Sequence, residues 1–349
     1  MTASPATQRL ASIDMVKGLA IIGVTFIHST VLGQDSLWMT LLVVHSVPVF
    51  LVLFGMNSES WFRRHTGERR TLEWWERGVK RILIPAWATL AVWWVMVLVL
   101  KPAIVRVTPS LPLYHLIGYM KQVGMGWFVT VVLQLVLLFP LFHWLARRAG
   151  IAVVLALGLA ATLVTLFYVQ TIRGSLGLSG WMVLSPRFFA HVAFGMLLAP
   201  YAGRLGRRAV IAALVAYVVL ALVQEKVLLA AWWRFANRLL ELPLTVLLLA
   251  AMARLASVDV LRTSLSWLGQ HSFGLYLGQL LTHNGFLFAF GGECTIFGCQ
   301  GGVFERFDLW VYTGILAAGS LFFLALGHAA LRLAESLRTN GVPLPDLST

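Results

Sequence analysis

Charged residues are scarce in this sequence. Only 12% of its 349 residues are Asp, Glu, Lys or Arg, about half the share of an ordinary soluble domain, whereas 59% are hydrophobic. Apolar runs of about 20 residues, the length at which an α-helix crosses a bilayer, recur along the whole chain. The composition leaves no segment for a soluble domain and predicts an all-α, multi-pass membrane protein with a single domain, 1–349.

Acidic residues are the scarcest charged group, with 14 Asp and Glu against 27 Lys and Arg. The apolar runs predict ten spans, at 14–34, 41–61, 81–100, 126–145, 151–170, 182–200, 209–227, 239–256, 266–290 and 309–331. With a cytoplasmic N-terminus, eighteen basic residues fall in inner segments, eight in outer segments, and Arg187 within a span. The positive-inside rule then places both termini in the cytoplasm, so the basic excess is a topology signal and no nucleic-acid partner is expected.

The start of the chain shows no cleavable signal peptide, because the first apolar run is long and lacks a small-residue cleavage pattern. The connection 63–81 is basic with a Trp pair, and we expect it to form an amphipathic helix on the inner leaflet. The outer connection 101–125 contains three prolines and indicates a partly structured rim. No internal repeat is visible, which counts mildly against a secondary transporter.

Cysteine is almost absent. The two cysteines, Cys294 and Cys299, lie in the Gly-rich stretch GGECTIFGCQGG, which the charge rule places outside. Their spacing on the oxidising side predicts a small loop closed by a disulfide. A metal site is the weaker interpretation, because no His or further Cys stands beside them there. No expected helix carries a His-Glu or Cys-His ligand spacing either, so we expect no metal requirement.

The first span contains a lysine and a histidine on one face. Lys17 and His28 are eleven residues apart, almost three helical turns, which separates them by about 16 Å along the axis. Lys17 then lies at the cytoplasmic entrance and His28 lies past the bilayer midplane. Asp14 is placed to pair with Lys17, and Gly18 and Gly23 leave room for another helix or a ligand. An ionisable residue inside a span indicates function, the alternative being a histidine bonded to a neighbouring helix for packing.

Other polar residues occur at comparable depth. Arg187 and His191 are four apart in the sixth span, and Tyr276, Gln279 and His283 follow at spacings of three and four in the ninth. Together with His28 they predict a polar cavity in the central and outer membrane. His45 and His271 are better interpreted as buried polar groups with partners.

Basic residues gather at the inner face just before Pro85. The cluster consists of Lys17, Arg77, Lys80 and Arg81. Two interpretations stand side by side for the last three: topology anchoring, or a cytoplasmic site for a phosphate-rich ligand. An inner anion site, a deeper histidine and a cavity open outward would let a cytoplasmic cofactor pass a group to an acceptor outside.

Six stretches carry a further signal in chain order. They are RLASIDMVKGLAIIGVTFIH, VPVFLVLFG, ERGVKRILIPAW, MGWFVTVVLQL, RFFAHVAFGMLLA and LSWLGQHSFGLYLGQLL. In this order they resemble the acyltransferase-3 family of integral membrane acyltransferases, whose opening signature has a basic residue ten intervening positions before a histidine. The resemblance covers nearly the full chain.

The resemblance implies transfer of an acyl group, commonly acetyl, from cytoplasmic acyl-coenzyme A to a hydroxyl of an envelope glycan, a lipid-linked sugar or a small natural product, at the inner membrane of a bacterium. By position, His28 is the catalytic histidine, either as general base or as covalent acyl carrier. Lys17, beside Asp14, binds coenzyme A phosphates or orients the thioester. The remaining candidates are Arg77, Lys80 and Arg81 for phosphates, Arg187 for the oxyanion or acceptor, and Trp127, His191, Tyr276, Gln279 and His283 for the acceptor.

The sequence departs from the family pattern at two positions. The late segment has Gln279 where the family usually has histidine, and Phe54 precedes Gly55 where Ser-Gly is usual. A glutamine side chain forms hydrogen bonds but does not carry a proton near neutral pH. The departure points to altered chemistry or a binding role, with His283, one turn further on, as a candidate substitute.

Two other functions compete with the enzyme. In an exporter or flippase of a saccharide or lipid-like substrate, the buried histidines and Arg187 would line a translocation path. In a scaffold, the chain would position a partner enzyme. The inner basic cluster discriminates, because an acyl-coenzyme A enzyme needs it and an exporter of neutral sugars does not. The acceptor, the acyl chain length and the oligomeric state do not follow from the sequence.

Overall fold

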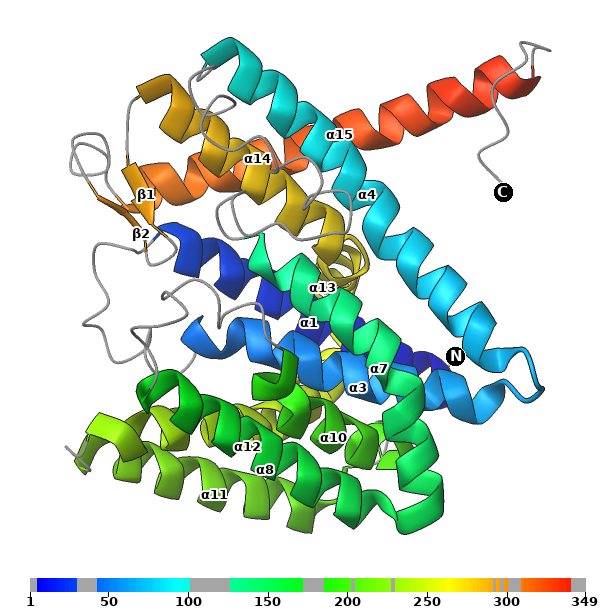
Figure 1. Ribbon diagram of the computed structural model, residues 1–349, viewed down its shortest axis with the longest axis vertical. Coiled ribbons are helices and arrows are strands. Elements are labelled where there is room, and N and C mark those ends of the chain that lie inside the picture. Colours follow the sequence, from blue (N-terminus) through cyan, green and yellow to red (C-terminus); the bar gives the residue numbers. More distant parts are fainter. Residues whose placement is uncertain are drawn as a thin grey trace.

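The computed structural model describes residues 5–29, 43–100, 126–171, 185–201, 205–226, 230–290, 293–295, 298–300 and 309–339. These residues are almost entirely helical (Figure 1). The helices are α1 (Pro5–Ser29), α3 (Ser46–Arg64), α4 (Arg70–Leu100), α7 (Trp127–Ala149), α8 (Ile151–Thr171), α10 (Phe189–Leu198), α11 (Arg207–Lys226), α12 (Ala230–Leu255), α13 (Asp259–Gln270), α14 (Ser272–Phe290) and α15 (Leu309–Thr339), with short 3₁₀ turns η1 (Val43–His45), η3 (Ser185–Phe188) and η4 (Ala199–Tyr201).

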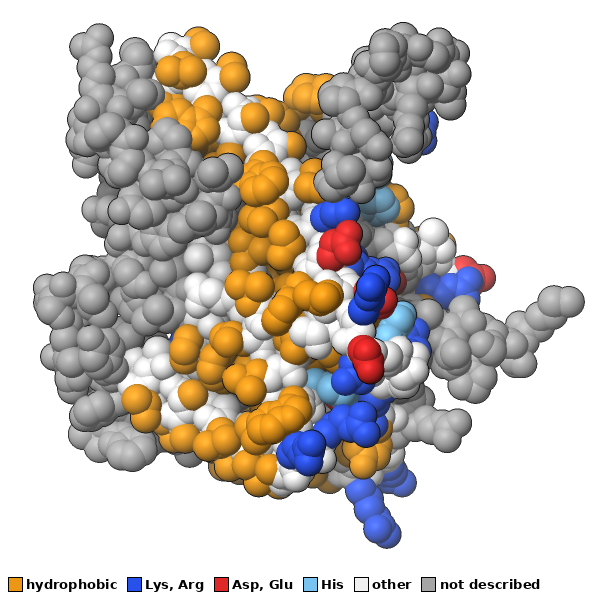
Figure 2. Space-filling view, turned by 45° about the vertical axis from the view of Figure 1, so that its right-hand side comes forward, with side chains coloured by type: hydrophobic (Ala, Val, Ile, Leu, Met, Phe, Trp, Pro, Cys, Tyr) orange, Lys and Arg blue, Asp and Glu red, His pale blue; other side chains and the backbone are white. Residues whose placement is uncertain are grey.

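The helices support membrane insertion. Within the described residues four helical segments are long and apolar enough to span a bilayer: Ala11–His28, Arg70–Val99, Trp127–Ala149 and Val311–Ala329. A helix lies in each of the ten apolar segments, but ten crossings and the side of the termini stay predictions. On the face shown in Figure 2, a broad hydrophobic surface lies beside an edge where Lys, Arg, Asp, Glu and His side chains gather. An apolar surface bounded by a charged edge is the arrangement expected at a membrane boundary.

Two expectations about helix boundaries were wrong. The segment 266–290 is not one helix, because α13 ends at Gln270 and α14 begins at Ser272. The break falls at His271, whose ring Nδ1 and backbone N–H both hydrogen-bond to the Trp267 carbonyl. The stretch 63–81 is not a separate helix on the inner leaflet either. A short turn follows Arg64, and the rest of the stretch forms the first turns of α4.

Paired tryptophans hold the start of α4 against α7. The Trp74 indole donates a hydrogen bond of 2.9 Å to the Val136 carbonyl, and Trp75 donates one of 3.1 Å to the Leu137 carbonyl. Pro140 lies four residues after Val136 and has no N–H, so this carbonyl lacks its usual helical donor. Trp74 supplies the missing donor. The Trp pair therefore joins two helices, which explains why it does not mark a membrane-surface helix.

Glycines allow the closest helix crossings. A Cβ built on Gly18 of α1 would lie 2.1 Å from the Leu265 carbonyl oxygen of α13, and one on Gly269 would lie 1.8 Å from the Asp14 carbonyl oxygen. At Gly23 it would meet the Ser46 side chain at 2.0 Å. The expectation that Gly18 and Gly23 admit a neighbouring element is confirmed. The crossing fixes α13 against the part of α1 that carries Asp14 and Lys17.

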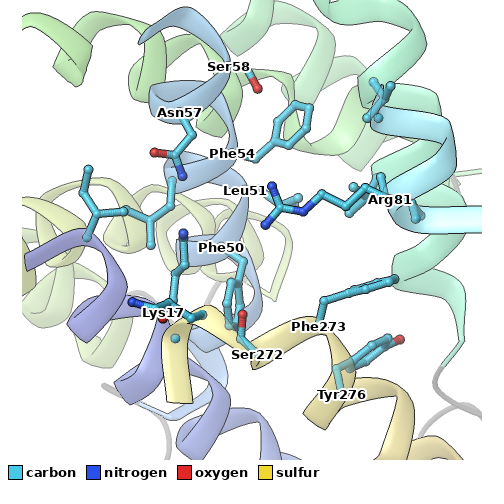
Figure 3. A pocket seen from close by; sticks show the side chains of 18 of the residues that line it. Lys17, Phe50, Leu51, Phe54, Asn57, Ser58, Arg81, Ser272, Phe273 and Tyr276 are labelled. Carbon is cyan, nitrogen blue, oxygen red and sulfur yellow. The ribbon is translucent and has the colours of Figure 1, made fainter. Parts of the chain in front are cut away.

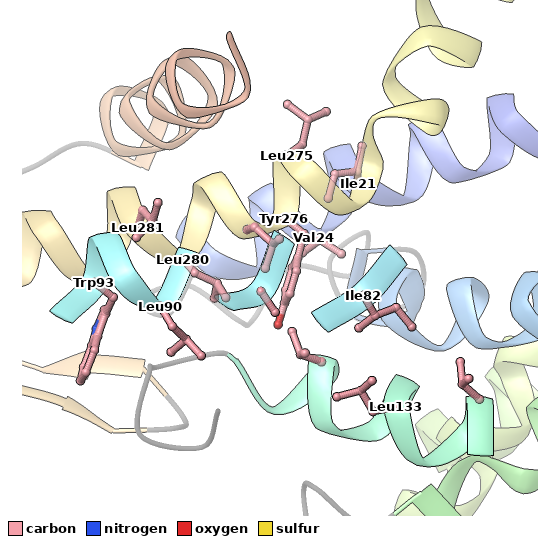
Figure 4. Close-up of a cluster of buried hydrophobic side chains, with 14 of the residues drawn as sticks. Ile21, Val24, Ile82, Leu90, Trp93, Leu133, Leu275, Tyr276, Leu280 and Leu281 are labelled. Carbon is pink, nitrogen blue, oxygen red and sulfur yellow. The ribbon is translucent and has the colours of Figure 1, made fainter. Parts of the chain in front are cut away.

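One of the three buried apolar clusters among the described residues surrounds the candidate site. It joins α1, α4, α7 and α14, and Tyr276 lies at its centre (Figure 4). Trp93 of α4 is 2% exposed and Leu280 of α14 is fully buried. A helix that packs on several sides in this way holds its polar residues at fixed positions.

A short hairpin follows α14. Strands β1 (Glu293–Thr295) and β2 (Gly298–Gln300) pair antiparallel, so that Cys294 lies opposite Cys299 in the backbone register. The hairpin is a small addition to the expected all-α fold. The register is compatible with the predicted disulfide, which stays a prediction.

Candidate active site

The inner end of α1 carries an ion pair. Lys17 Nζ donates a hydrogen bond of 2.9 Å to Asp14 Oδ1, as the three-residue spacing predicts. Gln270 of α13 donates to the other oxygen of Asp14 at 3.4 Å. Asp14 therefore holds Lys17 in place and links it to the α13–α14 junction. The lysine side chain remains 22% exposed, so it is available to a ligand.

A cavity of about 420 Å³ opens beside this pair, between α1, α3, α4, α7, α13 and α14. Its basic lining residues are Lys17, Arg64, Arg77 and Arg81, with Asp14 as the single acidic one. In Figure 3 the Arg81 side chain reaches into the cavity from the side opposite Lys17. We call the part of the cavity lined by Lys17, Arg64, Arg77, Arg81 and Asp14 the cationic mouth. The mouth suits an anionic ligand, because several guanidinium groups and an ammonium face one space.

The rest of the cavity is apolar and largely aromatic. Phe50, Phe54, Trp61 and Trp74 line it beside the mouth, and Phe54 occupies the position where the family pattern has serine. Val24, Phe128 and Tyr276 line it toward the interior. A long ligand with a charged end and an uncharged arm matches this distribution.

Of the four predicted phosphate-binding residues, Lys80 does not line the cavity. It donates a hydrogen bond of 2.9 Å to Glu76 on the exposed side of α4, where both side chains are largely accessible. Arg77 and Arg81 lie one turn apart on the side of the helix that lines the cavity. Arg64, at the end of α3, joins them in the cavity lining and was not singled out from the sequence.

His28 lies beyond the cavity, one turn after Val24 on α1. Its side chain is buried, and its Nδ1 is 3.1 Å from Oε1 of Gln279 on α14. Gln279 Nε2 donates a hydrogen bond of 2.5 Å to Thr25 Oγ1, and Thr25 in turn donates to the Ile21 carbonyl at 3.0 Å. The three side chains form one connected network between α1 and α14.

This network fixes the proton on His28. Because the Thr25 hydroxyl hydrogen is directed to a carbonyl, Thr25 accepts from the Gln279 amide nitrogen. The Gln279 oxygen therefore faces His28, and a carbonyl oxygen only accepts. His28 Nδ1 carries the hydrogen, and Nε2 keeps its lone pair. Gln279 is thus a positioning residue, which gives a physical role to the departure from the family's histidine.

The other polar residues of α14 extend this group. Tyr276 and His28 have ring centroids 6.4 Å apart, and His283 is close enough to His28 for an electrostatic interaction. His283 Nδ1 forms a hydrogen bond of 2.6 Å with the Tyr312 hydroxyl of α15. The predicted spacing of Tyr276, Gln279 and His283 along one helix is confirmed, and all three side chains are buried.

Arg187 and His191 belong to a second buried group. They do not share one α-helix as expected, because Arg187 lies in the 3₁₀ turn η3 and α10 begins at Phe189. The Arg187 guanidinium lies 4.6 Å from the centre of the Phe188 ring, which also contacts His191. Trp127 stacks on Phe188 with centroids 6.0 Å apart. None of these residues lines the cavity.

Glu241 completes the second group and was missed in the sequence. Its carboxylate lies between His45 Nδ1, at 3.4 Å, and His191 Nε2, which it contacts closely. All three side chains are 1% exposed. The sequence signal was a lone carboxylate in the apolar stretch of α12, which requires a buried partner. His45 has the partner that its interpretation as a satisfied buried group requires.

A second buried carboxylate, that of Glu59, joins α3 to α7. Glu59 accepts from His143 at 2.8 Å and from Arg63 at 2.7 Å, and the Glu59 and His143 side chains are each 5% exposed. His143 was also missed in the sequence. This group lies behind the cavity wall rather than in it, since neither residue lines the cavity.

Comparison with protein families gives a match over nearly the whole chain. The family model of the acyltransferase-3 family, described as an acyltransferase domain, matches residues 10–331. The chain therefore belongs to this family and is a membrane acyltransferase. No curated protein and no solved structure matches it.

Proposed function

We propose that this acyltransferase transfers an acyl group, acetyl in the first instance, from cytoplasmic acyl-coenzyme A to a hydroxyl of an envelope glycan, lipid-linked sugar or similar acceptor. One observation carries the proposal. A cationic mouth leads into an aromatic cavity whose deep end lies one helical turn from His28, and the ring of His28 is hydrogen-bonded to Gln279. Coenzyme A has phosphates at one end and the thioester at the other, joined by an uncharged arm.

The basic residues of the mouth would bind the phosphates. Arg64, Arg77 and Arg81 offer forked donors, and Lys17 adds a compact charge on the side of α1. With Asp14 included, the mouth keeps an excess of positive charge. The pairing of Lys17 with Asp14 orients the lysine before the ligand arrives, so less side-chain freedom is lost on binding.

His28 would perform the transfer. Its Nε2 takes the proton of the acceptor hydroxyl while the hydroxyl oxygen attacks the thioester carbonyl carbon. The carbon–sulfur bond breaks, the ester forms, and the proton passes to the departing thiolate to give free coenzyme A. In a two-step variant Nε2 attacks the thioester carbonyl carbon, the carbon–sulfur bond breaks and coenzyme A leaves as the thiolate. The acceptor hydroxyl oxygen then attacks the acyl carbon, the carbon–nitrogen bond breaks, and the hydroxyl proton passes to the thiolate. In both variants Gln279 keeps the reactive lone pair on Nε2.

The test is acetyl-coenzyme A binding and coenzyme A release by the purified full-length protein in detergent. We expect slow release with water as acceptor, loss of release in His28→Ala, and weaker binding in Lys17→Ala. Arg262→Ala is the matched control, because Arg262 is a basic residue that pairs with Asp259 and does not line the cavity. Absence of binding by the wild type at millimolar cofactor would refute the proposal and favour the exporter.

A further inference from the structure

The deep end of the cavity, nearest to His28, is closed by aromatic rings. Tyr276 and Phe128 line it there, whereas His28 is not among the lining residues. The Tyr276 ring lies 6.4 Å from the His28 ring, centroid to centroid, and the Val24 side chain is the last that α1 contributes to the lining. A group that enters through the cationic mouth therefore meets Tyr276 before it meets His28.

Tyr276 is held firmly in this position. Its ring packs edge-on against Phe128 of α7, with centroids 5.5 Å apart and planes at 72°. Its hydroxyl accepts a hydrogen bond from the Phe128 backbone amide in the first turn of α7. The ring also lies nearly parallel to Phe273, at 6.4 Å, and the side chain is 6% exposed. Figures 3 and 4 show it from the cavity side and from the surrounding core.

We infer that Tyr276 and Phe128 form an aromatic gate between the cavity and His28, and that this gate restricts the donor to short acyl chains. The inference rests on the proposed function, and it adds the chain length, which the sequence does not give. His28 is buried behind the two rings, so an acyl group that reaches it enters a packed interior, and such interiors accommodate extra methylenes poorly.

The position of the gate lets it distinguish short from long acyl donors instead of excluding all of them. Longer chains would be held in the aromatic cavity, where Phe50 and Phe54 offer apolar surface, without the thioester reaching His28. Longer donors would therefore bind but react slowly. One additional methylene in a tight pocket changes kcat/KM about 10- to 200-fold, so two additional methylenes should lower it by at least about tenfold.

The experiment compares coenzyme A release from acetyl-, butyryl- and hexanoyl-coenzyme A, with binding of each donor measured in parallel. We expect the wild type to bind all three and to prefer acetyl over butyryl by at least about tenfold in kcat/KM. Tyr276→Ala should reduce this ratio severalfold, mainly through kcat, and Tyr276→Phe should retain it because the ring remains. Phe128→Ala provides a second opening of the gate in case Tyr276→Ala does not fold.

Phe142→Ala is the matched control. Phe142 is a buried aromatic residue on α7, the helix of Phe128, but it packs against Phe189 and does not line the cavity, so its truncation should leave the ratio of the donors unchanged. If the wild type uses acetyl-coenzyme A but the ratio is unchanged in both gate variants, the inference is wrong and the proposed function stands. If no donor binds to the wild type, the proposed function fails instead.

Discussion

The crossing of α1 and α13 allows a quantitative test of the fold. At Gly18 an added methyl group would lie 2.1 Å from the Leu265 carbonyl oxygen, and ordinary contact begins at 3.4 Å. Gly18→Ala therefore forces the two helices apart by about 1.3 Å, because the clash is with backbone and cannot be relieved by rotating a side chain. At Gly314 of α15 the described part of the chain has no atom within 4 Å of the same position, so Gly314→Ala meets no obstacle there.

Both variants gain stability from the higher helix propensity of alanine, but only Gly18→Ala loses stability from overpacking. Replacing glycine by alanine inside a helix stabilises it by about 1 kcal/mol. Overpacking a well-packed contact costs about 1–3 kcal/mol. We therefore expect Gly314→Ala to raise the free energy of unfolding by about 1 kcal/mol and Gly18→Ala to fall about 1–3 kcal/mol below it.

The measurement is thermal unfolding of both variants and wild type in the same detergent, followed by tryptophan fluorescence. Acetyl-coenzyme A binding is measured alongside, because Lys17 and Asp14 lie within one turn of Gly18 and line the cavity. Gly18→Ala should unfold at a lower temperature than Gly314→Ala and bind the donor more weakly. Equal unfolding temperatures and equal binding would mean that the helix crossing is not as close as described, and the reasoning would fail.

Three further predictions concern buried hydrogen bonds. Trp74→Phe should lower the free energy of unfolding by about 1–3 kcal/mol, because Pro140 leaves its acceptor carbonyl without the usual helical donor, and Trp75→Phe should cost less in the same denaturation assay. Glu241→Ala should destabilise by about 3–5 kcal/mol, since it strands two buried histidines, whereas the exposed Glu76→Ala should cost at most about 1 kcal/mol. Gln279→Leu should reduce coenzyme A release about 10- to 100-fold with unchanged donor binding. Gln279→Glu should restore part of this release, because it keeps an acceptor oxygen. Equal release rates in the two variants would argue against the positioning role of Gln279.

The local relations in the site could be predicted from the sequence. Helical spacing alone places Asp14 beside Lys17, and it aligns Tyr276, Gln279 and His283 on one helix. Small residues inside a span indicated close helix approach, and Gly18 confirms it. These relations depend on regular helix geometry and on residues that lie within a few turns of each other.

Relations between distant segments could not be predicted in the same way. The Glu241 carboxylate meets His45 and His191 from residues 196 and 50 positions away, and no periodicity encodes such a meeting. The partner of His28 is Gln279, 251 positions away; the sequence placed both in one polar cavity but gave no reason to pair them. Hydropathy likewise averages over neighbouring residues, so it joined α13 to α14 although a local backbone bend at His271 separates them.

A single helix carries both the barrier in front of His28 and the group that orients it. Tyr276 and Gln279 are both on α14, which is locked to α15 where Gly278 meets the Ser320 backbone and Gly319 meets Thr282. Any displacement of α14 that widened the passage would also withdraw the amide oxygen from His28. Access to His28 and the orientation of its ring therefore depend on the same helix. If α14 moved to open the site, His28 would lose the hydrogen bond that orients it. In the proposed mechanism, rotation of the Tyr276 or Phe128 ring would admit an acyl donor while α14 keeps Gln279 beside His28.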